Sequence, residues 1–193
     1  MATVFTHAFV GAAIGAMYAC GGKPVEKSEK LPLRFWAVCA IAAALPDFDV
    51  AGFHYDIAYG SLLGHRGITH SLLFALLLSF VAAPLACRGW DDFRRRRLTL
   101  VPVLFLVAAS HGVIDAATNG GFGVAFFAPF ENSRYFLLWR PIEVAHIGIR
   151  SFLREDGLYV LGNEFINVWV PTAIVTSFVL WLKSVAASLS RGG

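Results

Sequence analysis

Residues 68–87 read ITHSLLFALLLSFVAAPLAC, a run in which His70 is the one acidic or basic side chain. A bilayer hydrocarbon core about 30 Å thick is crossed by roughly 20 apolar residues of helix. The run has the length and the composition that this crossing requires. It therefore predicts a transmembrane helix.

Four further stretches predict transmembrane helices in the same way: Thr3–Cys20, Leu33–Asp49, Leu98–Ala117 and Val168–Leu189. Of the 193 residues, 57% are hydrophobic and 15% are charged, whereas an ordinary soluble domain is about 45–50% apolar and about 25% charged. This composition excludes the soluble, disordered, collagen-like and coiled-coil classes. The predicted fold is an all-α polytopic membrane helix bundle that forms a single domain over residues 1–193.

Basic residues in the short loops set the predicted orientation. Cytoplasmic loops of membrane proteins carry an excess of lysine and arginine. Lys23, Lys27 and Lys30 lie in the first loop, and the run Arg94–Arg97 follows the third predicted helix. We therefore expect the N-terminus outside and the C-terminus in the cytoplasm. The arginine run is interpreted as a topology anchor, and no nucleic-acid partner is expected.

The long segment 118–167 separates the last two predicted transmembrane helices. It is dense in aromatic residues, among them Phe122, Phe126, Phe130 and Trp139. Aromatic rings are enriched at membrane–water interfaces. We therefore expect interfacial or re-entrant helices that lie over the outer end of the bundle.

Ionisable residues of the predicted spans gather near that outer end. Each one costs at least about 2.5–3.5 kcal/mol at the centre of a membrane helix, so its presence needs a reason. Four histidines and three aspartates fall there: His7, Asp47, Asp49, His65, His70, His111 and Asp115. His111 lies about 20 Å along its helix from Leu98, and so roughly 10 Å below the outer edge of the hydrocarbon core.

These residue types are typical of metal ligands. His111 and Asp115 are one helical turn apart, so they share a face and can bind one ion together. Asp47 and Asp49 follow Pro46, where the helix should end, so both carboxylates can turn toward one site. Imidazole and carboxylate without thiolate suit zinc, manganese or non-redox iron. Seven candidates exceed the ligands of one tetrahedral ion, so one or two divalent ions, with zinc preferred, are predicted.

Each candidate ligand alone also has an ordinary structural explanation, such as a polar helix cap or a histidine bonded to a neighbouring helix. Convergence from four helices is what favours metal binding. Thr69, Ser71 and Asn119 are candidates for orienting the ligands. His54 and His146 lack supporting neighbours and are interpreted as interfacial histidines.

Several motifs occur in an order that resembles one known family. They are Thr6-His7 with Gly11 and Gly15, LPDFD at 45–49, HRGITHS at 65–71, HGVID at 111–115, and APF, SRYF and RPI at 128–130, 133–136 and 140–142. The sequence resembles the YbcI/YdjM family of bacterial and archaeal inner-membrane proteins, which are described as metal-dependent hydrolases. The match covers most of the chain. It implies the same cytoplasmic (inner) membrane location and the same class of activity.

A more distant likeness is to zinc-dependent phospholipase C and its nuclease relatives, which are all-helical enzymes with clustered zinc. By the order of its residues, this likeness implies the following ligands: His7, Asp47, His70, His111 and Asp115. Those enzymes also carry a His-x-x-x-Glu helix downstream, whereas Glu143 and His146 occur here in the reverse order. The likeness therefore does not extend to a full three-zinc site.

The predicted function is that of a membrane-bound metal-dependent hydrolase in which metal-activated water attacks a phosphoester or similar bond. Membrane lipid is the expected partner, and a lipid headgroup is a candidate substrate. Asp49 is predicted to act as general base. Arg66 is predicted to hold the substrate phosphate together with Arg134, although a role as an interface anchor explains Arg66 equally well.

The alternative function is non-enzymatic: a metal or proton carrier, or a structural scaffold. A carrier needs polar residues that continue across the membrane. The cytoplasmic halves of the predicted helices are nearly all Ala, Val, Leu, Ile and Phe, so no such path is visible. A scaffold would not need seven candidate ligands inside the membrane.

Overall fold

The computed structural model describes residues 1–19, 33–87, 93–146, 148 and 157–190. The regular structure of these residues is helical, and apart from helices they form two isolated β-bridges and no strand. The predicted fold class, a helical membrane bundle, is confirmed.

The described residues contain six α-helices: α1 Val4–Ala19, α2 Leu33–Ala44, α3 Leu72–Ala86, α4 Phe93–Ala116, α6 Gly157–Glu164 and α7 Val170–Leu189. Three further helical segments adjoin them: the 3-10 helices η1 Leu45–Tyr55 and η2 Ile68–His70, and the π-helix η3 Phe165–Trp169. Because η1 directly continues α2, and η3 joins α6 to α7, each set forms one uninterrupted helical rod.

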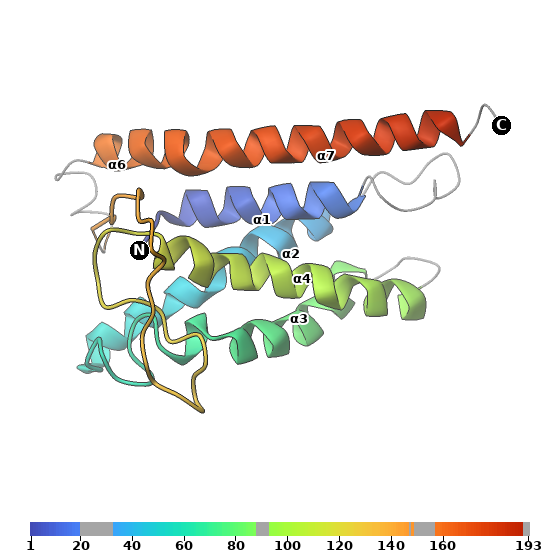
Figure 1. Ribbon diagram of the computed structural model, residues 1–193. Helices are drawn as coiled ribbons and strands as arrows, with labels where there is room; N and C mark the ends of the chain where they lie inside the picture. The colour runs from blue at the N-terminus through green and yellow to red at the C-terminus, as the bar shows by residue number, and fades with distance from the viewer. Residues whose placement is uncertain (20–32, 88–92, 147, 149–156, 191–193) are drawn as a thin grey trace.

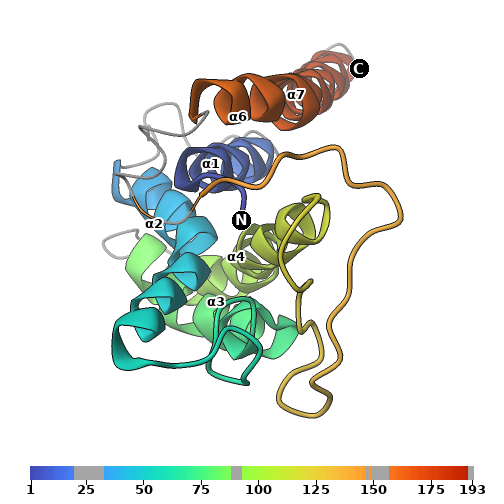
Figure 2. The ribbon, with the colours of Figure 1, turned by 90° about the vertical axis from the view of Figure 1, so that its left-hand side faces the viewer.

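Helices α1 to α4 pack as a bundle, and the rod of α6, η3 and α7 lies along α1 at its edge (Figures 1 and 2). Phe35 and Cys39 of α2, alanines of α3 and leucines of α4 fill the interior. Small residues let membrane helices approach closely. A Cβ on Gly11 of α1 would lie 2.6 Å from the Cβ of Ala43. Helices α1 and α2 therefore meet at this glycine.

Three of the described helical rods are long and apolar enough to cross a membrane: Leu33–Tyr55, Leu98–Ala116 and Gly157–Leu189. Val4–Tyr18 and Leu72–Ala86 are shorter apolar helices. The last rod begins at Gly157 instead of at the predicted Val168, because its polar residues do not interrupt the helix. Helix α7 has no buried residue, as expected for a helix surrounded by lipid on most sides.

The basic residues that set the predicted orientation are only partly visible. Lys23, Lys27 and Lys30 lie outside the described residues, and Arg94–Arg97 belong to the first turns of α4. The orientation of the bundle in the membrane therefore stays a prediction.

The chain between residues 118 and 146 forms turns and extended stretches where the sequence predicts interfacial helices. Gly121 and Gly123 have φ of 82° and 75°, which helical backbone does not adopt. The segment crosses the end of the bundle at which the N-terminus lies (Figure 1). The backbone N–H of Ala125 donates to the carbonyl of Arg66, so the segment is fixed to the turn before α3. We call residues 118–146 the covering segment.

Candidate metal centre

The seven predicted ligands come from different elements and meet beneath the covering segment. They are His7 of α1, Asp47 and Asp49 of η1, His65 of the turn before η2, His70 of η2, and His111 and Asp115 of α4. Their side chains are at most 7% exposed. Pro46 lies in the first turn of η1 and lacks the N–H that would continue the α-helical ladder. The chain therefore changes to a 3-10 helix where the two aspartates begin.

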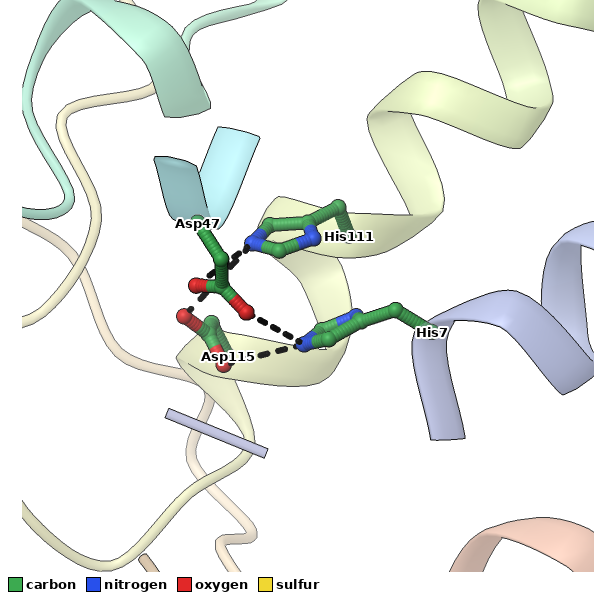
Figure 3. Close-up of side chains that lie close together, drawn as sticks. All are labelled: His7, Asp47, His111 and Asp115. Atoms are coloured by element: carbon green, nitrogen blue, oxygen red, sulfur yellow. Dashed lines mark ion pairs between the residues drawn. The ribbon is translucent and has the colours of Figure 1, made fainter. Parts of the chain in front are cut away.

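Four of these residues surround a common point: His7, Asp47, His111 and Asp115 (Figure 3). His7 Nε2 lies 3.6 Å from Asp115 Oδ1 and 3.8 Å from Asp47 Oδ2. His111 Nε2 lies 3.3 Å from Asp47 Oδ1 and 3.9 Å from Asp115 Oδ2. Most of these distances are too long for strong hydrogen bonds. They are near the roughly 3.3 Å that separates the ligand atoms of a tetrahedral zinc ion.

Two histidine rings of the cluster approach each other so closely that a proton or a metal ion must lie between them. His111 Nδ1 donates to the carbonyl of Ala43 at 2.7 Å, and His70 Nδ1 lies 3.2 Å from Asp49 Oδ2, which accepts its proton. If both rings are neutral, each therefore has a lone pair on Nε2, and the two Nε2 atoms are 2.9 Å apart. Two lone pairs at this distance repel each other unless a cation or a proton lies near both.

Several buried polar atoms of the cluster have no hydrogen-bond partner among the described residues: both ring nitrogens of His7, both carboxylate oxygens of Asp47, and Nε2 of His65. A buried polar group without a partner costs about 1–3 kcal/mol, and a buried charge costs more. Metal coordination removes this cost for the Asp47 carboxylate and for one nitrogen of each histidine, so the residues present fit a divalent cation.

Asp49 has a different environment from Asp47. Its Oδ1 accepts from His65 Nδ1 at 2.6 Å, and its Oδ2 accepts from the Thr69 hydroxyl at 2.6 Å. Because Asp49 also faces His70 Nδ1, one carboxylate orients two imidazole rings through their Nδ1 atoms, so that Nε2 is the nitrogen of each ring that can bind a metal ion. Asp47, His65 and His70 accordingly form a second group that can hold a metal ion.

Arg66 is fully buried, and its guanidinium bonds to the protein. Nε donates to Asp115 Oδ2 at 3.2 Å, one terminal nitrogen donates to the Gly120 carbonyl, and the other donates to the Thr118 hydroxyl. The residue has a φ of 62°, in a region that residues with a Cβ rarely adopt and that only firm surroundings maintain. This geometry favours orientation of Asp115, and the predicted contact of Arg66 with substrate stays a prediction.

Arg134 fixes the covering segment over the cluster. Its guanidinium donates to the carbonyls of His65, Tyr59 and Ser61 at 3.0–3.2 Å. Partial burial lowers the pKa of the guanidinium and raises the pKa of the Tyr59 hydroxyl. The carbonyls that Arg134 contacts belong to the turn that positions His65.

The three predicted orienting residues differ in their contacts. Thr69 donates to Asp49, as described above. Ser71 instead caps α3, because its hydroxyl accepts from the N–H of Phe74. Asn119 donates to Glu143, away from the cluster. His54, predicted to be interfacial, is exposed.

Sequence reasoning missed Glu164. Its side chain is fully buried, and it accepts hydrogen bonds from Thr3 and Thr6 of the α1 N-terminus. The predicted last helix started after this residue, which placed it in a loop. An acidic residue within the apolar stretch from Gly157 to Leu189 was the signal that could have found it.

Comparison with known proteins identifies the family. The family model described as YdjM inner membrane protein matches residues 1–188. The chain belongs to the YdjM inner membrane protein family. The inner membrane protein YbcI of Escherichia coli strain K12 is 34% identical to this chain over 187 residues, which are 95% of this chain and 99% of the relative. No solved structure gives a significant match.

Membership of the YdjM family confirms the resemblance that the ordered motifs indicate. It also confirms that the chain is an inner-membrane protein, in agreement with its membrane-spanning helices. The names of the family and of YbcI state a location and no reaction. The chemistry must therefore be argued from the buried His/Asp cluster.

Proposed function

We propose that this member of the YdjM family is a membrane-embedded metal-dependent hydrolase. The observation that carries the proposal is the buried His/Asp cluster, whose unpartnered nitrogen and oxygen atoms face one another at ligand-to-ligand distances. Hydrogen bonds among the residues that the structure describes do not satisfy these atoms. A purely structural polar cluster would be expected to pair its members.

His7, Asp47, His111 and Asp115 hold one divalent ion in this proposal, and His65 and His70 share Asp47 for a second. The set of imidazole and carboxylate ligands favours zinc, with manganese or iron as alternatives. A bound ion supplies a Lewis acid that polarises a phosphoryl oxygen and lowers the pKa of a water molecule.

The residues around the ligands keep this centre in place. The Ala43 carbonyl fixes the tautomer of His111, and Asp49 fixes those of His65 and His70. Arg66 offsets part of the negative charge and orients Asp115. Asp49 is the proposed general base, and its hydrogen bonds to His65 and Thr69 give it an orienting role as well.

The proposed substrate is a phosphoester of a membrane lipid. Large exposed side chains lie on η1, which supplies Asp47 and Asp49, and on the covering segment, among them Phe48, Tyr55, Phe130 and Trp139. Aromatic residues of this kind are typical of the membrane interface, where the headgroup of a lipid lies. A centre at this depth suits a headgroup better than a solute from bulk water.

Metal analysis of detergent-purified protein tests the centre. We expect at least one zinc, manganese or iron ion per wild-type chain, and loss of metal in His111→Ala and Asp47→Ala. His54→Ala is the matched control, because it removes an exposed histidine outside the cluster. Unchanged metal content in both ligand variants would overturn the assignment.

Hydrolysis is tested on metal-loaded protein in mixed micelles with a panel of lipid phosphoesters. Release of a phosphorylated headgroup or of inorganic phosphate, lost after chelation and in Asp47→Ala, is the expected result. A metal-loaded protein that cleaves none of the panel but moves metal ions into liposomes would contradict the hydrolase and favour a carrier.

A further inference from the structure

Glu164 is a buried carboxylate that the proposed chemistry does not use. It ends α6, inside the rod Gly157–Leu189 that is long enough to cross the membrane. An ionisable residue at such a position is expensive and usually functional. It contacts the N-terminus of α1, which is the element that supplies His7.

The carboxylate of Glu164 is fully bonded to that N-terminus. Oε1 accepts from the backbone N–H of Thr3 at 2.5 Å, and Oε2 accepts from the hydroxyls of Thr3 at 2.5 Å and Thr6 at 2.7 Å. The first N–H groups of a helix lack partners within the helix and attract negative charge. Glu164 therefore caps α1 from another helix.

The π-helix η3 places a second residue on the same threonine. In a regular α-helix of 3.6 residues per turn, the side chains of Glu164 and Trp169 would point in directions about 140° apart. In η3 the N–H of Val170 donates to the carbonyl of Phe165, and this wider turn brings residues five apart close to one face. Trp169 Nε1 donates to the Thr6 hydroxyl at 2.6 Å, so this hydroxyl both accepts from Trp169 and donates to Glu164.

His7 immediately follows Thr6, and it differs from the other histidines of the cluster. His65 and His70 are oriented by Asp49, and His111 by a backbone carbonyl. Neither nitrogen of His7 has a hydrogen-bond partner among the described residues. Its ring stacks on that of His111, with the centroids 3.7 Å apart. Its position therefore depends on the placement of α1, which is set by the packing of α1 against α2 and α4 and by the contacts of its first turn.

The geometry points to Glu164 as the positioning residue for His7, acting through Thr3 and Thr6 with the help of Trp169. The rod of α6, η3 and α7 is thereby coupled to the metal centre, although it supplies no ligand. This inference rests on the proposed metal centre.

A double-mutant cycle on metal affinity tests the coupling. Zinc affinity is measured by chelator competition in wild type, Glu164→Ala, His7→Ala and the double variant. We expect Glu164→Ala to weaken binding by about 10–100-fold, as is typical when an orienting partner is removed. In the His7→Ala background the same change should have little further effect. An equal weakening in both backgrounds, or no weakening in either, would overturn the inference.

The spectrum of the cobalt-substituted protein gives a readout that stability alone does not change. We expect the cobalt bands of Glu164→Ala to shift toward those of His7→Ala, with Glu164→Gln intermediate because an amide still accepts from Thr3. Trp169→Phe keeps the ring and should cause a smaller shift. Glu143→Ala is the matched control, because that carboxylate bonds to Asn119 and not to α1. A wild-type spectrum for both Glu164 variants would contradict the coupling.

The two proposals fail in distinguishable ways. If the wild-type protein binds metal but cleaves no lipid phosphoester, the hydrolase proposal fails. The role of Glu164 is then decided by the zinc affinities of the double-mutant cycle alone. If metal binding is normal and independent of Glu164, the role of Glu164 alone fails. A wild-type protein that binds no metal would overturn both.

Discussion

Asp47 and Asp49 are two residues apart, yet they should respond differently to the same substitution. Asp49 already accepts several hydrogen bonds, whereas both oxygens of Asp47 lack partners among the described residues. We expect Asp49→Asn to keep the bound metal and lower its affinity by about 10–100-fold. Asp47→Asn should lose metal altogether. Elemental analysis and chelator competition measure both effects, and identical behaviour of the two variants would contradict the distinction.

At the scale of single residues, the sequence was sufficient to find the cluster. It was not sufficient to tell which carboxylate orients the histidines and which one is left for the metal ion. Acidic and basic side chains are scarce in so apolar a chain, so the few near one end of the helices could be identified directly. Which carboxylate orients and which is left free depends on contacts between distant residues. Arg66, for example, bonds to Thr118 and Gly120, and no spacing in the sequence predicts those partners.

Among the helices, the close contact of α1 with α2 should control the position of His7. A Cβ on Gly11 would lie 2.6 Å from Ala43 Cβ and 2.7 Å from the Cys39 carbonyl. We expect Gly11→Ala to push α1 away, to destabilise the fold by about 1–3 kcal/mol through overpacking and to weaken metal binding through His7. Thermal unfolding in detergent and chelator competition measure the two effects.

A second glycine provides the control for this helix contact. Gly162 lies in α6, and a Cβ there would meet nothing within 4 Å. Because alanine is the better helix former by about 0.8–1.0 kcal/mol, Gly162→Ala should leave stability unchanged or raise it. Equal destabilisation by the two variants would show that the contact between α1 and α2 is not the cause.

The helices themselves were largely predictable, because long apolar runs in a membrane protein can form little else. The start of the last rod was not, since Asn163, Glu164 and Asn167 suggested a loop. These residues remain helical because their side chains find partners inside the protein: Asn163 donates to the Pro141 carbonyl, and Glu164 accepts from Thr3. The sequence predicts helices where the covering segment is irregular, because aromatic content indicates a membrane interface but does not determine the backbone conformation there.

For the molecule as a whole, the cluster side chains are at most 7% exposed and the covering segment is bonded to the turn that carries His65. We therefore expect this segment to move when a metal ion exchanges with solvent. Arg134 holds it by bonds to three carbonyls of the turn that includes His65. We expect Arg134→Gln to speed the removal of metal by a chelator severalfold while changing the equilibrium affinity little, because no proposed ligand is altered. Stopped-flow mixing with a chelator measures the rate of metal removal. An unchanged rate would contradict the proposal that Arg134 holds the covering segment in place.

The orientation of the molecule determines which face of the membrane the centre serves. The covering segment and the C-terminal end of α7 lie at opposite ends of the bundle (Figure 1). Phe130 of the covering segment is 85% exposed, and Ser190 follows α7 directly. Labels attached at these two positions therefore test the exposure of opposite ends of the bundle.

Cysteine labelling can decide between the two orientations. In a variant whose native cysteines are replaced by alanine, we expect Phe130→Cys to react with a membrane-impermeant maleimide in intact spheroplasts. Ser190→Cys should react only after lysis, because the basic loops are expected to keep that end in the cytoplasm. The opposite pattern would place the metal centre at the cytoplasmic face, and its lipid substrate would then belong to the inner leaflet.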